Sequence, residues 1–352
     1  GTTFNSIELR GGGPGQGYSI GGNTIALNAG LHVENNNGQP IDHTVSTMFV
    51  LNSNQTFTII NDVGILFLAS PINLNGKDLT FNVAPFSEAR SQGVISGPGT
   101  LTKTNAGKLL LSANNTYTGE TTLDGGTLQI NGLQPVSPVF LKAGTLKGLG
   151  TVGTLTGVGN GGPGSIVLSP GASPGVLTCS NVTLNTSTSF AVELNGAGDY
   201  DQLNVNGSVT LNGAALALAL GFIPAFGTSF TIINNDGEDA VSGTFSGLPE
   251  GTLFTAGNLA FRITYAGGNG NDVAVLRVNL PPQFTSITKL GDNTVQLYGA
   301  GSSNLSYAIQ ANSNLTTTNW LLIGSALANG SGQFSFADTN ASLFPVRFYR
   351  AV

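Results

Sequence analysis

Short runs of alternating apolar and polar residues, bounded by glycine or asparagine, recur along most of the chain. Each run holds about four to seven residues, which matches a β-strand better than a helix. Examples are TFTII at 56–60, LTFNV at 79–83 and SVTLN at 208–212. No window of about 11 or more residues shows the 3.6-residue periodicity of an amphipathic helix. The pattern predicts an all-β protein.

The tripeptide Gly-Thr-Leu returns along the chain, with its glycine at Gly99, Gly126, Gly144, Gly153 and Gly251. Short strands that return to one phrase are typical of stacked coils, in which each coil buries its inward Leu, Val or Ile on the next. Asn-Gly and Gly-Gly corners supply the positive φ that such turns need. A β-sandwich shares the alternation, but it does not explain so long a series of short strands. We therefore predict a parallel β-solenoid.

The pattern of residues changes after Leu280. Pro281 and Pro282 form a stiff spacer that cannot continue a hydrogen-bonded ladder. Beyond it, turn signals about every 8–12 residues predict a small C-terminal β-sandwich of immunoglobulin or fibronectin type. The predicted parts are a Gly-rich N-terminal segment (1–21), the β-solenoid (22–279) and the C-terminal β-sandwich (280–352).

The C-terminal part contains the single tryptophan of the chain, Trp320. With Tyr307 and Phe348 it could form a platform on which sugars stack. In a domain this small, however, a lone tryptophan usually anchors the core. We expect the core position for Trp320.

Composition narrows the classes of function. Of the 352 residues, 51 are glycine, 12 are Lys or Arg and 18 are Asp or Glu, which gives a net charge of −6. The basic residues are scattered singly, so no stripe for phosphate contacts exists and nucleic acid is not an expected partner. Cys179 is the single cysteine, which excludes a disulfide within the chain, and we expect its thiol to fill an inward position.

The longest apolar run covers residues 214–226 and is broken by Gly221 and Pro224. It is too short for the roughly 20 residues of a membrane-spanning helix. Its alternation of Leu and Ala predicts instead a strand that is packed on both faces. We expect no transmembrane segment.

Residues 97–132 hold a dense set of phrases: G-x-G-x-L-x-K (97–103), G-x-L-x-L-S (107–112), N-x-Y-x-G (115–119) and G-G-T-L-Q-I (125–130). This stretch resembles the autotransporter-associated β-strand repeat of bacterial passenger domains. Residues 169–177, 200–213 and 243–251 resemble segments that follow such repeats. The resemblance implies a right-handed β-helix on a bacterial surface, used in adhesion, aggregation or display. The C-terminal residues are similar to the fibronectin-like modules that close some bacterial repeat proteins.

A polysaccharide lyase or hydrolase is the enzyme class that suits a β-helix, and it needs paired carboxylates. Asp199 and Asp201 lie two residues apart and form the best such pair in the predicted solenoid. Between Lys147 and Arg262 there is no basic residue to neutralise an acidic sugar. We therefore interpret the two aspartates as a turn with a solvated rim, and we predict no catalytic residue.

Two other groups hold residue types that bind metals. His32 and His43 stand beside Glu34 and Asp42, and we interpret them as surface-loop residues in preference to a metal site. No serine stands in a G-x-S-x-G context, and Cys179 has no histidine near it in the sequence, so no nucleophilic triad is expected.

The phrase GGNGND at 267–272 matches the first six positions of a calcium-binding nonapeptide, and acidic residues also gather at 236–239. The calcium candidates are Asp272, Asn269, Asp236 and Asp239. Because the nonapeptide occurs once and such sites form between consecutive turns, we favour a tight hairpin and a solvated loop. No cofactor and no metal are expected, with calcium as the alternative.

We predict a non-catalytic extracellular structural or adhesive protein, not an enzyme, which forms the subunit of a surface filament assembled head to tail through its ends. Solenoid ends leave unpaired N–H and C=O groups that recruit another chain unless they are capped. The alternative is a carbohydrate-binding or carbohydrate-active β-helix with surface glycans as ligands. A groove that gathers carboxylates, histidine and aromatic rings would favour that alternative. We expect a place outside or on the surface of a bacterium, with a leader sequence removed.

Overall fold

The computed structural model describes residues 2–11, 17–34, 41–60, 64–159 and 161–352. Within them the chain forms 38 β-strands and one short 3₁₀ helix, so the predicted all-β class is confirmed. The chain divides into two compact units. The first comprises residues 1–222, 230–251 and 263–275, and the second comprises 223–229, 252–262 and 276–352.

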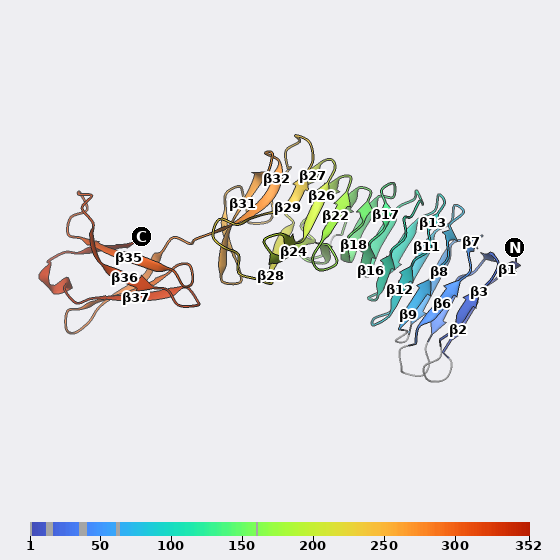
Figure 1. The fold of residues 1–352 in the computed structure, drawn as a ribbon, viewed down its shortest axis with the longest axis horizontal. Helices are drawn as coiled ribbons and strands as arrows, with labels where there is room; N and C mark the ends of the chain where they lie inside the picture. The colour runs from blue at the N-terminus through green and yellow to red at the C-terminus, as the bar shows by residue number, and fades with distance from the viewer. Residues whose placement is uncertain (1, 12–16, 35–40, 61–63, 160) are drawn as a thin grey trace. The chain divides into compact units, whose positions relative to one another are not determined.

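The first unit is a parallel β-solenoid, as predicted (Figure 1). Most of its strands pair in parallel with their counterparts on the next rung and so form columns along the solenoid. Leu194 and Tyr200 belong to an antiparallel pair within it. Ile25 pairs with Phe49 and Phe49 with Ile72, so one rung takes 24 or 23 residues there. Further along, Thr127 pairs with Thr145 and the rung shortens to 18 residues.

The first column is the five-stranded sheet of β1 (Thr2–Phe4), β4 (Ile25–Leu27), β7 (Phe49–Leu51), β10 (Ile72–Asn73) and β13 (Ile95–Ser96). The other two columns make up a 19-stranded sheet: β2 (Ile7–Arg10), β3 (Ser19–Gly21), β5 (Leu31–Glu34), β6 (His43–Ser46), β8 (Gln55–Ile60), β9 (Ile65–Leu68), β11 (Leu79–Val83), β12 (Glu88–Ser91), β14 (Leu101–Thr104), β15 (Lys108–Leu111), β16 (Thr121–Ile130), β18 (Val139–Gly148), β20 (Leu155–Gly157), β21 (Ile166–Pro170), β23 (Val182–Thr183), β24 (Thr188–Gly196), β25 (Asp199–Tyr200), β27 (Val209–Thr210) and β28 (Ala215–Leu220). An eight-stranded sheet contains β17 (Leu133–Gln134), β19 (Thr151–Val152), β22 (Val176–Cys179), β26 (Gln202–Val205), β29 (Ser229–Asn235), β30 (Leu253–Ala256), β31 (Leu259–Gly267) and β32 (Asp272–Val278).

Alternation along each strand sends one set of side chains into the solenoid. Phe57 on β8 and Phe81 on β11 are fully buried and meet edge to face at 5.5 Å between ring centroids. Burying one such side chain contributes about 1.5–3 kcal/mol. Ladders of this kind hold the rungs together without covalent links.

The Gly-Thr-Leu phrases at Gly126 and Gly144 stack on adjacent rungs. Thr127 pairs with Thr145, and Leu128 pairs with Leu146, in parallel register. The phrases at Gly126 and Gly144 therefore mark equivalent positions of successive rungs, as predicted for a solenoid. The phrases at Gly99 and Gly153 lead into another column, where Leu101 pairs with Thr121 and Leu155 pairs with Val139.

The parallel ladder begins at Thr2, whereas the sequence placed its start at residue 22. Strand β1 pairs with β4, β2 pairs with β5 and β3 pairs with β6. The run IELR at Ile7–Arg10 has the same alternation as later strands, with Leu9 buried and Arg10 exposed. The glycine content of the segment hid that alternation. Residues 1 and 12–16 of the predicted N-terminal segment lie outside the described residues.

Strand β28 contradicts the expectation of a strand packed on both faces. It pairs with β24, and among the described strands no second partner follows it. Ala217 and Ala219 are exposed, while Leu216 and Leu218 are half-buried. The alternation of Leu and Ala therefore belongs to an edge strand with one inward face. The large leucine side chains face inward, and the small alanine side chains face outward.

The second unit contains the C-terminal module, which consists of two three-stranded antiparallel sheets. One holds β33 (Gln283–Lys289), β34 (Val295–Ala300) and β37 (Gln333–Asp338), and the other holds β36 (Leu321–Leu327), β35 (Ser306–Asn312) and β38 (Phe348–Ala351). The 3₁₀ helix η1 (Ala341–Leu343) lies before β38. Leu297, Tyr307, Ile309 and Phe334 from both sheets share one core, which gives the sheet-on-sheet arrangement of a small sandwich.

Trp320 does not anchor that core, contrary to the sequence expectation. Tyr307 and Phe334 fill the central aromatic positions, with ring centroids 5.2 Å apart. Trp320 precedes β36 in irregular chain and is half-buried, and the Arg350 guanidinium lies 4.5 Å from the centre of its ring. The expectation failed because Trp320 occupies no inward strand position.

Candidate functional site

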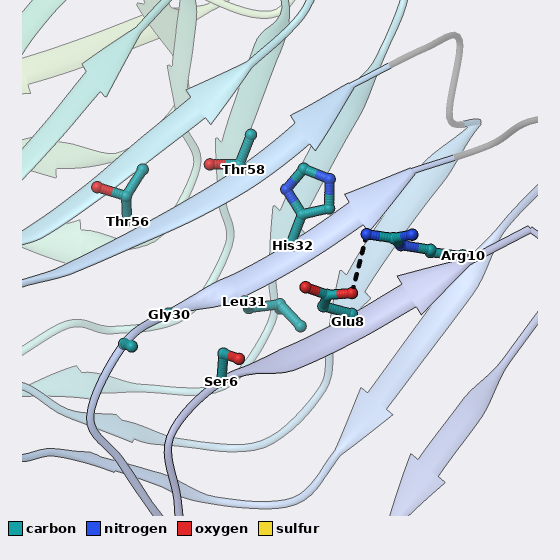
Figure 2. Close-up of a pocket in the computed structure, with 9 residues that line it drawn as sticks. Ser6, Glu8, Arg10, Gly30, Leu31, His32, Thr56 and Thr58 are labelled. Carbon is teal, nitrogen blue, oxygen red and sulfur yellow. Dashed lines mark ion pairs between the residues drawn. The ribbon is translucent and has the colours of Figure 1, made fainter.

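A polar groove of about 410 Å³ lies on the first rungs of the solenoid. It is built on β2, β5 and β8, where Glu8 pairs with His32 and His32 pairs with Thr58. Leu31 and Phe57 point inward, so the alternating side chains His32, Thr56 and Thr58 line the outer face. Figure 2 shows this outward row, with Ser6 and Gly30 at its edge.

The groove carries charges of both signs. Arg10 Nη2 lies 3.1 Å from Glu8 Oε2 (Figure 2), and Arg10 Nε lies 4.0 Å from Glu34 Oε2. His32 Nε2 lies 3.6 Å from the same Glu34 oxygen. Exposed ion pairs of this type are worth about 0–1 kcal/mol each. These ion pairs therefore contribute little to the stability of the fold. Their main effect is to fix the positions of donors and acceptors on the surface.

The groove has the chemistry of a hydrogen-bonding surface. Glu8 presents acceptors, Arg10 presents a forked set of donors, and the threonine hydroxyls do both. Among its described lining residues there is no Phe, Tyr or Trp, so sugars have no ring on which to stack. Of the groups that the glycan alternative called for, the described lining holds one carboxylate, Glu8, and one histidine, His32, but no Phe, Tyr or Trp.

The aspartates that the sequence paired have different surroundings. Asp199 is exposed, whereas Asp201 is 1% exposed. Asp201 Oδ1 accepts a hydrogen bond from the main-chain N–H of Gly175 (2.9 Å), and its Oδ2 accepts one from Glu193 (3.0 Å). Burial raises the pKa of Asp201, and these two hydrogen bonds oppose the rise. The expectation of a solvated rim is therefore wrong for Asp201. Its carboxylate joins two segments of the solenoid, because it accepts hydrogen bonds from the main-chain N–H groups of Gly175 and Glu193.

The two histidines differ in the same way. His32 is half-exposed in the groove, but His43 is fully buried, which corrects the surface-loop interpretation for that residue. His43 Nδ1 accepts a hydrogen bond from the Tyr18 N–H (3.2 Å), and the two rings stack at 5.7 Å. Burial lowers the pKa of His43, and the carboxylate of Asp42 opposes that shift. The residue is inward because it starts β6 at a position of the buried row.

Cys179 occupies an inward position on β22 and is fully buried, as predicted. Burial raises the pKa of its thiol to about 12, so the thiol is not a nucleophile at neutral pH. Throughout the part of the chain that the structure describes, no group of three or more His, Cys, Asp or Glu side chains could hold a metal ion.

The structure brings the two acidic segments of the calcium prediction together. The phrase at 267–272 forms the turn between adjacent strands β31 and β32, as the hairpin interpretation predicted. Asn269 Nδ2 donates to the Gly237 carbonyl (2.9 Å), and Asn271 Nδ2 donates to the Asp236 carbonyl (3.0 Å). The turn and the loop at 236–239 are therefore one cluster. The sequence could not predict this contact, because the two segments are about 30 residues apart.

The phrase N-x-Y-x-G in residues 115–119 forms a buried polar network. The Tyr117 hydroxyl contacts Thr121 Oγ1, which contacts Ser137 Oγ at 2.8 Å. Ser137 Oγ in turn donates to the Gly119 carbonyl (2.8 Å). Asn115 Oδ1 accepts from the Ile95 N–H (2.9 Å). The polar side chains of this corner thus bond one another and nearby main-chain groups inside the solenoid.

Lys103, at the end of the opening phrase, points into the solenoid and is fully buried. Its Nζ donates hydrogen bonds to the carbonyls of Thr104 (2.8 Å), Asn105 (2.7 Å) and Gly125 (3.3 Å). Burial lowers its pKa to about 8. The ammonium thus links a corner of one rung to the corner of the next.

The groove residues Ser6, Glu8 and Arg10 were missed by the sequence analysis. A signal was present, because IELR at 7–10 and LHVE at 31–34 have the same alternation one rung apart. Outward polar residues on neighbouring rungs form a surface row. The placement of residues 1–21 outside the solenoid concealed that row.

Comparison with known proteins agrees with this architecture. Residues 101–130 match the family model of the Passenger-associated-transport-repeat. The match lies inside the stretch 97–132 and includes Lys103, Tyr117 and Thr121. Among the described residues, no helix has the length and apolar character needed to span a membrane.

Two curated proteins are similar over more than half of this chain. The "Extracellular serine protease" of Serratia marcescens is 29% identical over 204 residues, which cover 55% of this chain and 18% of the relative. The "Adhesin BmaC autotransporter" of Brucella suis biovar 1 (strain 1330) is 29% identical over 236 residues, which cover 60% of this chain and 7% of the relative. The chain thus spans less than a fifth of the length of either protein. It carries an autotransporter passenger repeat, residues 101–130, within a parallel β-solenoid.

Proposed function

We propose that the chain is a non-catalytic adhesive solenoid outside or on the surface of a bacterial cell. The observation that carries the proposal is the passenger repeat at 101–130, whose strands β14, β15 and β16 belong to one parallel ladder. The relative named as an adhesin supports it. Adhesion by beads coated with the purified chain tests this role directly.

The absence of catalysis is part of the proposal, since one relative is named a serine protease. The chain spans 18% of that protein, so the similarity does not transfer its activity. His43 is fully buried and its Nδ1 accepts from the Tyr18 N–H, which supports the absence of a catalytic base at that residue. His32 lies beside Glu34, an arrangement that can orient a catalytic base, so His32 is the histidine that the activity test addresses.

Labelling with a fluorophosphonate probe tests for an activated serine. We expect no labelling, and no products from casein or from a panel of acidic and neutral polysaccharides. A labelled serine would contradict the proposal, and so would turnover that His32→Gln abolishes. The β-rich circular dichroism of each variant confirms that the fold is retained.

We further propose that copies of the chain associate through the ends of the solenoid into a filament. Support comes from β28, which pairs with β24 and has no second partner among the described strands. Ile223, which follows β28, is 80% exposed. An edge of this kind pairs readily with another chain.

Sedimentation and electron microscopy test the filament. Full-length protein at high concentration is expected to sediment as an assembly and to show fibres. Ala217→Lys and Ala219→Lys place charges on exposed positions of β28 and are expected to prevent assembly. The matched control Asp199→Lys, also exposed, leaves assembly unchanged. A compact monomer at every concentration would contradict this part of the proposal.

The groove on the first rungs supports a second candidate function, the binding of surface glycans. Glu8, Arg10 and His32 lie in one groove of suitable size for a small ligand. Binding to a glycan array is expected to depend on Arg10 and Glu8, so that Arg10→Ala and Glu8→Ala each weaken it. The control variant Arg262→Ala, at an exposed arginine outside the groove, keeps it. Glycan binding that is the same in all three variants would exclude the groove.

A further inference from the structure

The cluster between the loop 236–239 and the turn 267–272 contains two buried oxygen atoms without hydrogen-bond partners. They are Asn235 Oδ1 and Asn271 Oδ1, and both residues are 2% exposed. Among the described residues, seven buried side-chain atoms lack a partner, and these two belong to the same cluster. Buried acceptors normally find a partner, so the pair calls for a physical explanation.

The orientation of the two carboxamides is fixed by their other ends. Asn235 Nδ2 donates to the carbonyl of Asp239 (2.7 Å), and Asn271 Nδ2 donates to the carbonyls of Asp236 (3.0 Å) and Gly237 (3.2 Å). A carbonyl accepts and cannot donate, so a flipped amide would bring two acceptors together. The atoms without partners are therefore the oxygens.

The carboxylate of Asp272 is bonded to the main chain of the same cluster. Asp272 is 5% exposed, and its Oδ1 accepts a hydrogen bond from the Asn235 N–H (2.9 Å). Its Oδ2 faces the turn, since a Cβ added to Gly268 would lie 1.9 Å from that atom. Only glycine at 268, with φ of +55°, leaves this space free. Two carboxamide oxygens and one carboxylate are thus held by one loop and one turn.

A set of oxygen acceptors with no donor among them suits a hard cation. Calcium accepts neutral carboxamide and carboxylate oxygens in flexible geometry, whereas magnesium requires a near-ideal octahedron. The exposed side chains of Asp236, Glu238 and Asp239 add negative potential around the cluster. With a single buried carboxylate, the affinity falls in the weak range of about 10⁻⁴ to 10⁻³ M that is typical of extracellular modules.

We propose that Asn235, Asn271 and Asp272 form a calcium site that clamps the loop 236–239 to the β31–β32 turn. Oδ1 of both asparagines and the carboxylate of Asp272 are the protein ligands, and water completes the coordination. The single copy of the nonapeptide favoured a metal-free hairpin, whereas the two buried oxygens without partners favour the calcium alternative. The proposal does not depend on the adhesive function.

Isothermal titration of the full chain with calcium chloride, after removal of divalent ions by a chelator, tests the site. We expect one site with a dissociation constant of about 10⁻⁴ to 10⁻³ M. Asp272→Asn retains an acceptor for the Asn235 N–H but removes the charge, and it is expected to abolish the binding. Asp199→Asn removes an exposed carboxylate elsewhere and is expected to leave the binding unchanged.

If Asp272→Asn loses the β-rich circular dichroism, Asp239→Asn provides a second test. It removes an exposed charge beside the cluster, keeps the backbone carbonyl that Asn235 Nδ2 contacts, and is expected to weaken calcium binding several-fold. The proposal is overturned if the wild-type chain binds no calcium up to about 10 mM, ten times the weakest expected constant. It is also overturned if a folded Asp272→Asn variant binds as the wild type does, or if Asp239→Asn binds calcium as tightly as the wild type.

Discussion

Lys103 and Gly125 lie on successive rungs, and Lys103 Nζ donates a hydrogen bond of 3.3 Å to the Gly125 carbonyl. The same ammonium bonds the carbonyls of Thr104 and Asn105 on its own rung. A buried cation that bonds neutral carbonyls is costly to desolvate. Its pKa is accordingly lowered to about 8.

This relationship predicts how stability depends on pH. Between pH 8 and 10.5 the unfolded chain keeps the Lys103 proton while the folded chain releases it, so the free energy of unfolding rises with pH in that window. Below pH 8 both states hold the proton, and this contribution becomes constant. Urea unfolding across the window is expected to show the rise for wild type and to lose it in Lys103→Met. The control Lys142→Met, at an exposed lysine, is expected to keep the rise in the free energy of unfolding. A rise that persists in Lys103→Met would contradict this account.

His43 predicts a second pH dependence, at the acid side. Burial holds its pKa below 6.5 in the folded state, so the unfolded chain binds the proton first as the pH falls. The stabilising contribution is complete above pH 6.5 and is lost as the pH falls through the folded pKa. His43→Asn, whose oxygen can accept from the Tyr18 N–H, is expected to reduce this loss in urea unfolding. The matched variant His32→Asn, in the groove, is expected to keep the loss of stability at acid pH. If the free energy of unfolding depends on pH equally in both variants, the loss does not come from His43.

The polar network of the repeat predicts a small cost for Tyr117→Phe. The variant keeps the buried ring and removes the hydroxyl that contacts Thr121. Thr121 retains its contact with Ser137 at 2.8 Å, so the loss is one hydrogen bond, about 0.5–1.5 kcal/mol in the free energy of unfolding. Chemical denaturation measures it. Tyr200→Phe, at a half-buried ring that meets Phe230 edge-on, is the control, and an equal cost in both variants would argue against a special role for Tyr117.

Close approach of the rungs predicts a larger cost for Gly119→Ala. A Cβ at Gly119 would lie 2.2 Å from the Gly99 carbonyl oxygen, so the rungs must separate locally. Overpacking of this kind costs about 1–3 kcal/mol. At Gly198 the added Cβ meets nothing within 4 Å, and Gly198→Ala is expected to leave the midpoint of denaturation unchanged. Equal midpoints for the two variants would contradict the stacking of Gly119 on Gly99.

The solenoid itself could be predicted because its information is local and repeated. Each strand alternates, and phrases such as those at Gly126 and Gly144 mark the same place on successive rungs. Leu128 and Leu146 are inward in both. A few neighbouring residues are therefore enough to predict that a segment is a strand and which of its side chains face inward.

The sites could not be predicted in the same way, because they depend on which rungs lie beside each other. Asp201 looked like a turn residue until its two backbone donors, from Gly175 and Glu193, were in place. His43 differs from His32 by one property, the side of the strand on which it falls. A single-residue shift in the assumed register exchanges inward and outward positions.

The adhesive role is the central claim, and beads coated with the purified full-length chain test it most directly. The beads are exposed in a flow chamber to host-cell layers and to purified surface glycans, with beads carrying heat-unfolded chain as the control. We predict that beads with folded chain are retained under flow, that unfolded chain abolishes retention, and that no substrate is cleaved during the assay. Folded chain that retains no beads on any surface, or that releases products from one, would contradict the claim.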